Sequence, residues 1–176
     1  APLLETPSDS FGCTTRIEIA MGRSEPVDVV NEMVKLSSEL DPKAVGPVIA
    51  KCAYLLPRWG GSREELIAFM EQVMQERGDS VLLPILNSSN YGDVFKEFVS
   101  EDMRTRATQA AVKVPVDPKM ALQAAKFNAY SSSDPEKFRV FLAEVKEQKA
   151  DLRWAPGDYQ AYLDCLDRKN TAIGSA

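Results

Sequence analysis

The chain has 176 residues, of which 44% are hydrophobic and 27% are charged, and its formal net charge is -5. This composition is typical of a globular protein with one domain or one compact array of repeats. The acidic balance and the lack of a dense basic run argue against a nucleic-acid-binding protein. The complete absence of histidine excludes histidine-based triads, general bases and zinc sites.

The two ends of the chain carry little periodic pattern. We expect residues 1–23 to form an extended or poorly ordered lead, in which residues 16–21 are either a short strand or a first helical turn. We expect residues 170–176 to be a frayed tail. No stretch approaches the roughly 18 consecutive apolar residues of a membrane span, so no such span is expected.

From residue 24 to residue 169 apolar side chains recur at helical spacing, which predicts a single domain of helical hairpins. Ser24 is the expected N-cap of a first helix that continues to Leu40. The predicted buried face of this helix is a stripe of valine and methionine: Val27, Val30, Met33 and Val34.

A second helix is expected after Asp41–Pro42, which combines a capping carboxylate with a residue that has no N–H. Gly46–Pro47 delays its start by about one turn, and Pro57 ends it. The apolar residues of this helix are Val45, Val48, Ile49, Cys52, Ala53 and Leu56.

A capping box marks the start of a third helix. In this motif the Ser62 hydroxyl accepts a hydrogen bond from the N–H of Glu65, and the Glu65 carboxylate accepts one from the N–H of Ser62. Arg77 and Gly78 are expected to end the helix with a positive last turn and a glycine C-cap. Its predicted buried stripe consists of Leu66, Met70, Val73 and Met74.

Residues 80–92 mix apolar and turn-forming residues and give no clear element. Helical spacing then returns, and further helices are expected to start near Val94, Ser100, Asp117, Asp134 and Gly157. About seven or eight amphipathic helices with short links predict an all-α fold of stacked antiparallel helical hairpins. The hairpins that start at residues 24 and 62 are spaced like tetratricopeptide-class repeats, which are stable only when stacked on their neighbours.

The most distinctive segment is Pro57-Arg58-Trp59-Gly60-Gly61-Ser62. It resembles the P-[RK]-W-G-G-S signature of an uncharacterised bacterial family of tetratricopeptide-like helical proteins. The resemblance covers residues 38–75 and, more loosely, residues 118–146. It implies a tetratricopeptide-like α–α superhelix and a bacterial source, and it implies no activity. The first residue is Ala1, which is compatible with a removed signal peptide, so the bacterial cytoplasm and periplasm both remain open.

Arg58 and Trp59 lie in the turn of this segment, where two readings compete. In the structural reading, Pro57, Gly60 and Gly61 form a tight corner, and Ser62 and Glu65 cap the next helix. In the functional reading, Arg58 and Trp59 form an exposed binding hot spot, since both residue types are enriched in that role. A third reading, a phosphate cradle, has little support because the motif G-x-x-x-x-G-K-[ST] is absent.

A second Arg-Trp pair, Arg153-Trp154, precedes Pro156-Gly157 and repeats this arrangement. Packing of each tryptophan at its own corner is one interpretation. The other is that the two tryptophans form two aromatic anchors on one edge of the array.

Candidate catalytic groups are few. Acid–base catalysis by two carboxylates requires a dry cleft, whereas the acidic pairs are expected at helix starts and solvated faces: Glu64–Glu65, Glu101–Asp102 and Asp164–Asp167. Cys52 and Cys165 lie in amphipathic patterns and are expected to be buried. Cys13 lies in a Gly/Thr/Ser-rich stretch, is expected to be exposed, and is the one cysteine considered as a nucleophile. No metal or other cofactor is expected.

Three hypotheses follow. The preferred one is a non-enzymatic helical module that binds a protein or peptide, as an adaptor or an immunity-type protein does. The second is an enzyme or small-ligand-binding protein with a pocket at the loop of residues 58–61, in which Arg58, Glu64 and Glu65 make the polar contacts. The third is a structural fragment that associates with a second copy of itself.

Overall fold

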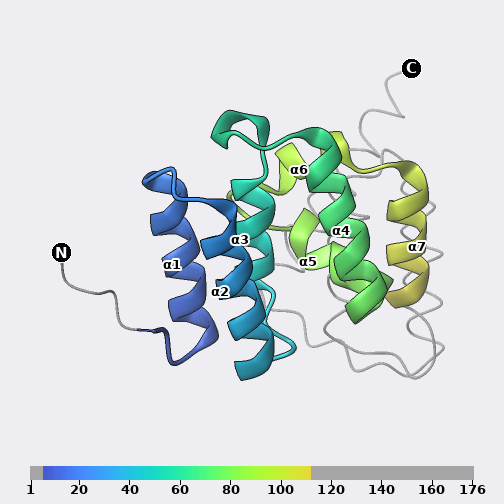
Figure 1. The fold of residues 1–176 in the computed structure, drawn as a ribbon. Helices are drawn as coiled ribbons and strands as arrows, with labels where there is room; N and C mark the ends of the chain where they lie inside the picture. Colours follow the sequence, from blue (N-terminus) through green and yellow to red (C-terminus); the bar gives the residue numbers. More distant parts are fainter. Residues whose placement is uncertain (1–5, 112–176) are drawn as a thin grey trace, which may run out of the picture. The chain divides into compact units, whose positions relative to one another are not determined.

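A computed structural model describes residues 6–111, and residues 1–5 and 112–176 lie outside the described part (Figure 1). Between residues 6 and 111 the chain is helical and contains no strand, which confirms the predicted all-α class. The chain divides into two compact units, residues 1–73 and residues 74–176, a boundary that the sequence pattern did not predict. The expected helices at Asp117, Asp134 and Gly157 and the expected tail of residues 170–176 lie outside the described residues.

The first unit is built from consecutive antiparallel helices. In chain order its elements are α1 (Ser10–Gly22), α2 (Val27–Leu40), α3 (Gly46–Tyr54), the 3-10 helix η1 (Pro57–Trp59) and α4 (Arg63–Arg77), whose last turn belongs to the second unit. The helices α1, α2 and α3 lie side by side, each packed on the other two (Figure 1). The hydroxyl of Tyr54, at the end of α3, donates a 2.7 Å hydrogen bond to the carbonyl of Glu25 and so ties α3 to the α1–α2 loop.

The expectation of an extended or poorly ordered lead over residues 1–23 is wrong for α1. Asp9 caps this helix by accepting a 2.7 Å hydrogen bond from the N–H of Gly12. Cys13, Ile17 and Ala20 follow one another at helical spacing and are fully buried, so α1 contributes to the core of the unit. The prediction failed because most of the other α1 side chains are small or polar, which leaves only a narrow apolar stripe in the sequence.

The start of α2 also differs from the prediction. Ser24 does not cap the helix; it lies in the preceding turn with a φ of 52°, and Pro26 occupies the N-cap position without a side-chain hydrogen bond. Val30 and Met33 are buried as predicted, whereas Val27 is 40% exposed and Leu40 is 44% exposed. The buried side of α2 consists of Val30, Met33 and Ser37, so it is rotated about the helix axis relative to the predicted stripe.

Of the two start signals in the sequence, Asp41–Pro42 and Gly46–Pro47, the second marks the start of α3. The helix begins at Gly46 with Pro47 in its first turn, which confirms the predicted delay. Asp41 ends α2 instead of capping α3, and its carboxylate accepts a 3.0 Å hydrogen bond from the N–H of Lys43. The residues that α3 buries are Pro47, Val48, Ala50, Cys52 and Ala53.

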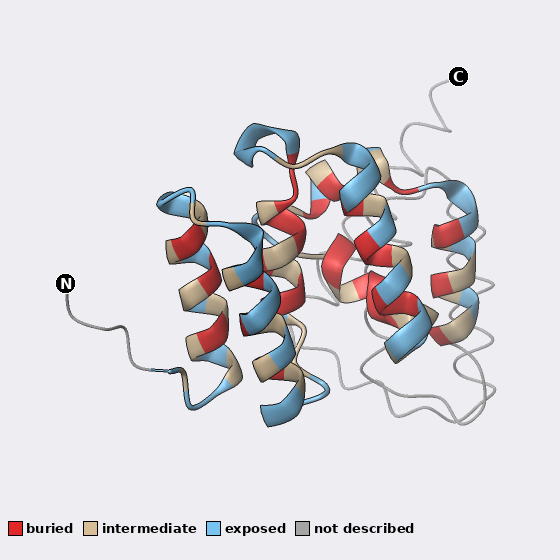
Figure 2. Cartoon of the chain, in the orientation of Figure 1, coloured by how far each residue is buried: buried red, intermediate tan, exposed pale blue. Residues whose placement is uncertain are grey.

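The pattern predicted for α4 is confirmed. The helix ends at Arg77, and Gly78 follows with a φ of 89° and a ψ of 151°, a positive-φ conformation that favours glycine. The four residues of the predicted stripe are all buried: Leu66, Met70, Val73 and Met74. In Figure 2 buried positions recur along one side of α1, α2, α4 and α7 (Glu101–Ala111), whereas α5 (Leu82–Leu86) is buried on nearly all sides.

The described part of the second unit contains four short elements. They are the 3-10 helix η2 (Asp79–Val81), α5 (Leu82–Leu86), α6 (Gly92–Phe98) and α7 (Glu101–Ala111). The unassigned stretch of residues 80–92 is thus partly helical, because Pro84 lies in the first turn of α5, where its missing N–H breaks no helical bond. Ser100 caps α7 as predicted, accepting a 3.2 Å hydrogen bond from the N–H of Met103.

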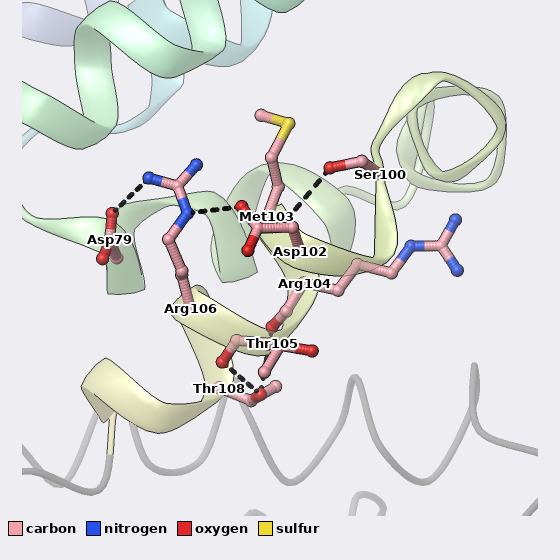
Figure 3. A network of polar contacts seen from close by, with 8 residues as sticks. All are labelled: Asp79, Ser100, Asp102, Met103, Arg104, Thr105, Arg106 and Thr108. Atoms are coloured by element: carbon pink, nitrogen blue, oxygen red, sulfur yellow. Dashed lines mark hydrogen bonds and ion pairs between the residues drawn. The ribbon is translucent and has the colours of Figure 1, made fainter.

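Arginine side chains fix α7 within this unit (Figure 3). The guanidinium of Arg106 bonds to Asp102 one turn earlier at 3.1 Å and to Asp79 of η2 at 3.5 Å. Arg104 donates to the carbonyls of Lys96 and Val99, which stand at the end of α6. These contacts join α7 to the elements before it.

In residues 6–111 no helix is both long enough and apolar enough to cross a membrane.

Candidate interaction site

Backbone hydrogen bonds build the turn between α3 and α4, here called the 57–61 corner. The N–H of Trp59 donates to the carbonyl of Leu56 at 2.9 Å, and the N–H of Gly60 donates to the carbonyl of Pro57 at 3.2 Å. Proline suits the first position of η1 because its φ is fixed and no donor is needed there. The main chain therefore sets the course of the corner.

The two glycines are required for different reasons. Gly60 has a φ of 94°, in the left-handed region that favours glycine. Gly61 passes so close to the end of α3 that a Cβ atom there would lie 2.2 Å from the carbonyl oxygen of Leu55. Gly60 thus has the positive φ expected of a turn glycine, whereas Gly61 is needed because only a residue without a Cβ atom can pass this close to the end of α3.

The corner ends at the cap of α4. The hydroxyl of Ser62 accepts a 3.1 Å hydrogen bond from the N–H of Glu65, as the capping box predicts. The second half of the predicted box differs: the Glu65 carboxylate accepts a 2.9 Å hydrogen bond from the Ser62 hydroxyl, where the prediction had the N–H of Ser62 as donor. The Glu65 side chain thus folds back over the start of α4, and these two bonds tie the first turn of the helix to the end of the corner.

Two side chains project from this backbone. Trp59 is 43% exposed and is one of the few large apolar side chains of the described residues with such exposure. The guanidinium carbon of Arg58 lies 5.8 Å from the centre of the Trp59 ring, at the distance of a cation–π contact. Arg58 is itself exposed. The corner therefore presents an aromatic face and a cation together.

The chain directly before the corner is buried. Leu55 and Leu56 are 7% and 2% exposed, so η1 starts from residues fixed in the core. One helical turn earlier, the ammonium of Lys51 lies 3.9 Å from the centre of the Phe69 ring on α4. This contact connects α3 and α4 below the corner.

Of the other residues predicted for a functional site, some lie outside the described part of the chain and some have a position in the structure. Arg153 and Trp154 lie outside the described residues, as do Asp164 and Asp167. The pocket hypothesis needed Arg58 to point inward with Glu64 and Glu65, but the structure exposes all three side chains.

The remaining acidic pair is not a catalytic dyad in this geometry. Glu101 and Asp102 are 76% and 78% exposed and form ion pairs within α7, at 3.8 Å to Arg104 and 3.1 Å to Arg106. They act as helix-start charges, as expected.

The expectation that Cys13 is exposed is wrong. Cys13 is fully buried between α1 and its neighbours, as is Cys52 on α3, while Cys165 lies outside the described residues. Burial, together with the carboxylate of Asp9, raises the pKa of the Cys13 thiol, and burial raises the pKa of Cys52. A cysteine nucleophile needs the opposite shift. Among the described residues there is no group of three acidic or thiol side chains that could hold a metal ion.

The structure also has a groove that the sequence analysis missed. It lies along α2, beside Arg16 of α1 and the two residues Thr6 and Pro7 that precede α1, and has a volume of about 410 Å³. Its apolar part comes from a second stripe on α2, which includes Val29, Met33 and Leu36. The spacing of this stripe was visible in the sequence, but without a helix at residues 10–22 there was no partner to form a groove with it.

The chain matches no protein-family model, no curated protein sequence and no solved structure.

Proposed function

We propose that this protein is a non-enzymatic helical module that binds a protein or peptide, and that Arg58 and Trp59 are part of its binding surface. The observation that supports this most is the exposure of Trp59, 43%, on a corner whose backbone is held by hydrogen bonds and by a buried leucine pair. Tryptophan and arginine are the residue types most enriched among the side chains that dominate binding energy.

The rigidity of the corner favours this role. Binding a mobile loop requires the loss of about 0.5–1.5 kcal/mol for each side chain that becomes ordered, together with the ordering of the backbone. The fixed φ of Pro57, the close approach of Gly61 and the cap at Ser62 leave little backbone freedom at residues 57–61. The contact between Arg58 and the Trp59 ring restrains both side chains further.

We also propose that the helical hairpins extend into a repeat superhelix, as the spacing of the sequence signals and the family resemblance suggest. The consecutive antiparallel helices α1, α2 and α3 support this part of the proposal. Adaptor or immunity-type proteins are the classes that such a module would fit.

The test is quantitative affinity capture of proteins from an extract of the source cell. Three forms of the full chain serve as bait: the wild type, Trp59→Ala and the control Phe11→Ala. Phe11 is 78% exposed on α1, so the control removes an exposed aromatic ring away from the corner. We expect at least one protein that the wild type and Phe11→Ala retain and Trp59→Ala loses.

The captured protein is then purified, and its dissociation constant is measured with each form. Loss of a tryptophan hot spot weakens binding by about 2 kcal/mol or more, which is about 30-fold. Equal affinity for wild type and Trp59→Ala would remove Trp59 from the binding surface. The absence of any protein partner under conditions that recover weak complexes would contradict the module hypothesis itself.

A further inference from the structure

Apart from Pro7, the apolar side chains that line the groove come from α2 and recur at regular intervals along this helix. The half-buried Val29 and Leu36 line it together with the small exposed part of Met33, 8% of its surface, and Leu40, 44% exposed, continues the same stripe to the end of α2. The intervals between these four residues are four, three and four. This is the spacing of the apolar seam by which one α-helix packs along another.

Charged side chains border this apolar stripe without partners of their own. Glu32, Lys35 and Glu39 line the groove, and none of them forms an ion pair within residues 6–111. The two glutamates are seven residues apart and therefore lie on the same side of α2 about 10 Å from each other. Their unpaired carboxylates form an acidic edge on a chain whose net charge is already -5.

The opposite side of the groove adds no unpaired positive charge at its surface. Arg16 of α1 lines the groove, but its guanidinium pairs with the carboxylate of Glu25 at 2.5 Å, and its side chain is only 19% exposed. Thr6 and Pro7 also line the groove and carry no charge. Beyond the Arg16–Glu25 pair, the charge that the groove offers to a partner is therefore two carboxylates and one ammonium.

We propose that this groove binds an amphipathic helix of a partner protein that carries its own apolar seam and basic residues one heptad apart. Such a helix would place its apolar side chains between Val29, Met33, Leu36 and Leu40, and its lysines or arginines beside Glu32 and Glu39. An acidic residue between them would face Lys35. The groove is a surface additional to the 57–61 corner, so it gives a partner class to the proposed binding function without depending on Trp59.

A second copy of this chain fits the groove less well. Packing α2 against its own copy through this seam would bring the edge formed by Glu32 and Glu39 close to acidic residues of the same kind, and like charges across an interface disfavour association. A basic helix has the opposite effect, because it meets the acidic edge with complementary charge.

The experiment measures binding of two synthetic helical peptides of about three heptads by fluorescence anisotropy with the full chain. Both peptides have leucine at the two seam positions of each heptad; one has lysine at the flanking positions and the other has glutamate. We expect the lysine peptide to bind and the glutamate peptide to bind at least about 10-fold more weakly. Raising the salt concentration should reduce this difference.

Two variants connect the binding to the groove. Glu32→Lys changes an exposed side chain and should weaken binding of the lysine peptide about 5- to 10-fold, while improving binding of the glutamate peptide. Leu36→Lys should weaken binding of both peptides by at least about 10-fold. Glu18→Lys is the matched control, because it makes the same charge change on an exposed α1 residue that does not line the groove, and it should leave both affinities unchanged.

Three outcomes would overturn the proposal. One is equal affinity of the wild type for the two peptides, and another is an equal effect of Glu32→Lys and Glu18→Lys. The third is self-association of the full chain in sedimentation equilibrium that Leu36→Lys abolishes, in the absence of peptide binding. Because the peptides test the groove alone, failure here leaves the result of Trp59→Ala unaffected.

Discussion

Two junctions between helices, one in each unit, are stabilised in opposite ways. In the first unit, the 57–61 corner is held by its backbone, and the side chains of Arg58 and Trp59 remain at the surface. In the second unit, the junction between α6 and α7 is held by side chains: Arg104 bonds the carbonyls of Lys96 and Val99 (Figure 3 shows its position on α7). At the 57–61 corner the hydrogen bonds that fix the turn come from the main chain, whereas at the α6–α7 junction they come from a side chain.

The largest effect is expected for a change in the backbone-held corner. Gly61→Ala places a Cβ atom 2.2 Å from the carbonyl oxygen of Leu55, so either α3 or the corner must move. We expect the free energy of unfolding to fall by about 3 kcal/mol. Urea unfolding followed by circular dichroism measures this. Gly22→Ala is the control, since a Cβ there meets nothing within 4 Å, and it should be nearly neutral. Equal stability of the two variants would show that the corner can relax at no cost.

The next largest effect is expected at the side-chain-held junction. Arg104→Met removes a guanidinium that donates to two carbonyls and should lower the free energy of unfolding by about 1–3 kcal/mol. Arg23→Met is the control, because Arg23 is 64% exposed and its nearest acidic partner, Glu25, is 3.8 Å away. If both variants unfold at the same urea concentration, the side chain of Arg104 does not hold the junction.

The helix caps allow a comparison in which the two junctions should behave alike. Ser62 caps α4 and Ser100 caps α7 through the same bond to the N–H three residues later, at 3.1 and 3.2 Å. Ser62→Ala and Ser100→Ala should therefore each lower the free energy of unfolding by about 1 kcal/mol. Thermal unfolding of the two variants under one set of conditions measures both. A clearly larger loss at Ser62 would indicate that the Glu65 contact contributes as well.

The smallest effect is expected for the exposed cation of the corner. Arg58→Ala should change the free energy of unfolding by less than about 0.5 kcal/mol, because the corner's backbone bonds do not involve this side chain. Binding of the captured partner should nevertheless weaken. A loss of stability as large as that of Arg104→Met would mean that the two junctions do not differ in the way described above.

The sequence predicted the elements in which several local signals agree. At α4, the capping box at Ser62, the apolar stripe through Met70 and the terminating glycine Gly78 all indicate the same helix, and the structure has it. At α3, Gly46–Pro47 correctly indicated a later start than Asp41–Pro42. Local rules suffice where capping, turn chemistry and periodicity are consistent.

The prediction failed where tertiary contacts decide. In α1 the residues that mark the helix are Cys13, Ile17 and Ala20, of which only one is large, so its stability depends on α2 and α3 rather than on its own pattern. At Ser24 a good capping residue is present, but Glu25 bonds back to the carbonyl of Ala20, and the helix begins later. The groove was not predicted because one side of it is formed by Arg16 of α1, and the sequence pattern had not indicated a helix there.

At the candidate site, the sequence predicted the turn and the helix cap of the 57–61 corner but not how far Trp59 is exposed. The signature around Trp59 directed attention to the corner, and the glycines and the cap have the structural roles expected of them. The exposure of Trp59 was one of two readings, because a tryptophan beside two glycines is compatible both with a packed lid and with an open surface. The exposed fraction of Trp59 in the structure, 43%, distinguishes a partly open position from a fully packed lid.

Pro57, Gly60, Gly61 and Ser62 set the course of the 57–61 corner, so its backbone does not depend on which side chains stand at positions 58 and 59. If the proposed binding surface is correct, substitutions at these two positions would change what the corner binds while its backbone keeps the same course. The same property makes the corner a natural place for a randomised two-residue library.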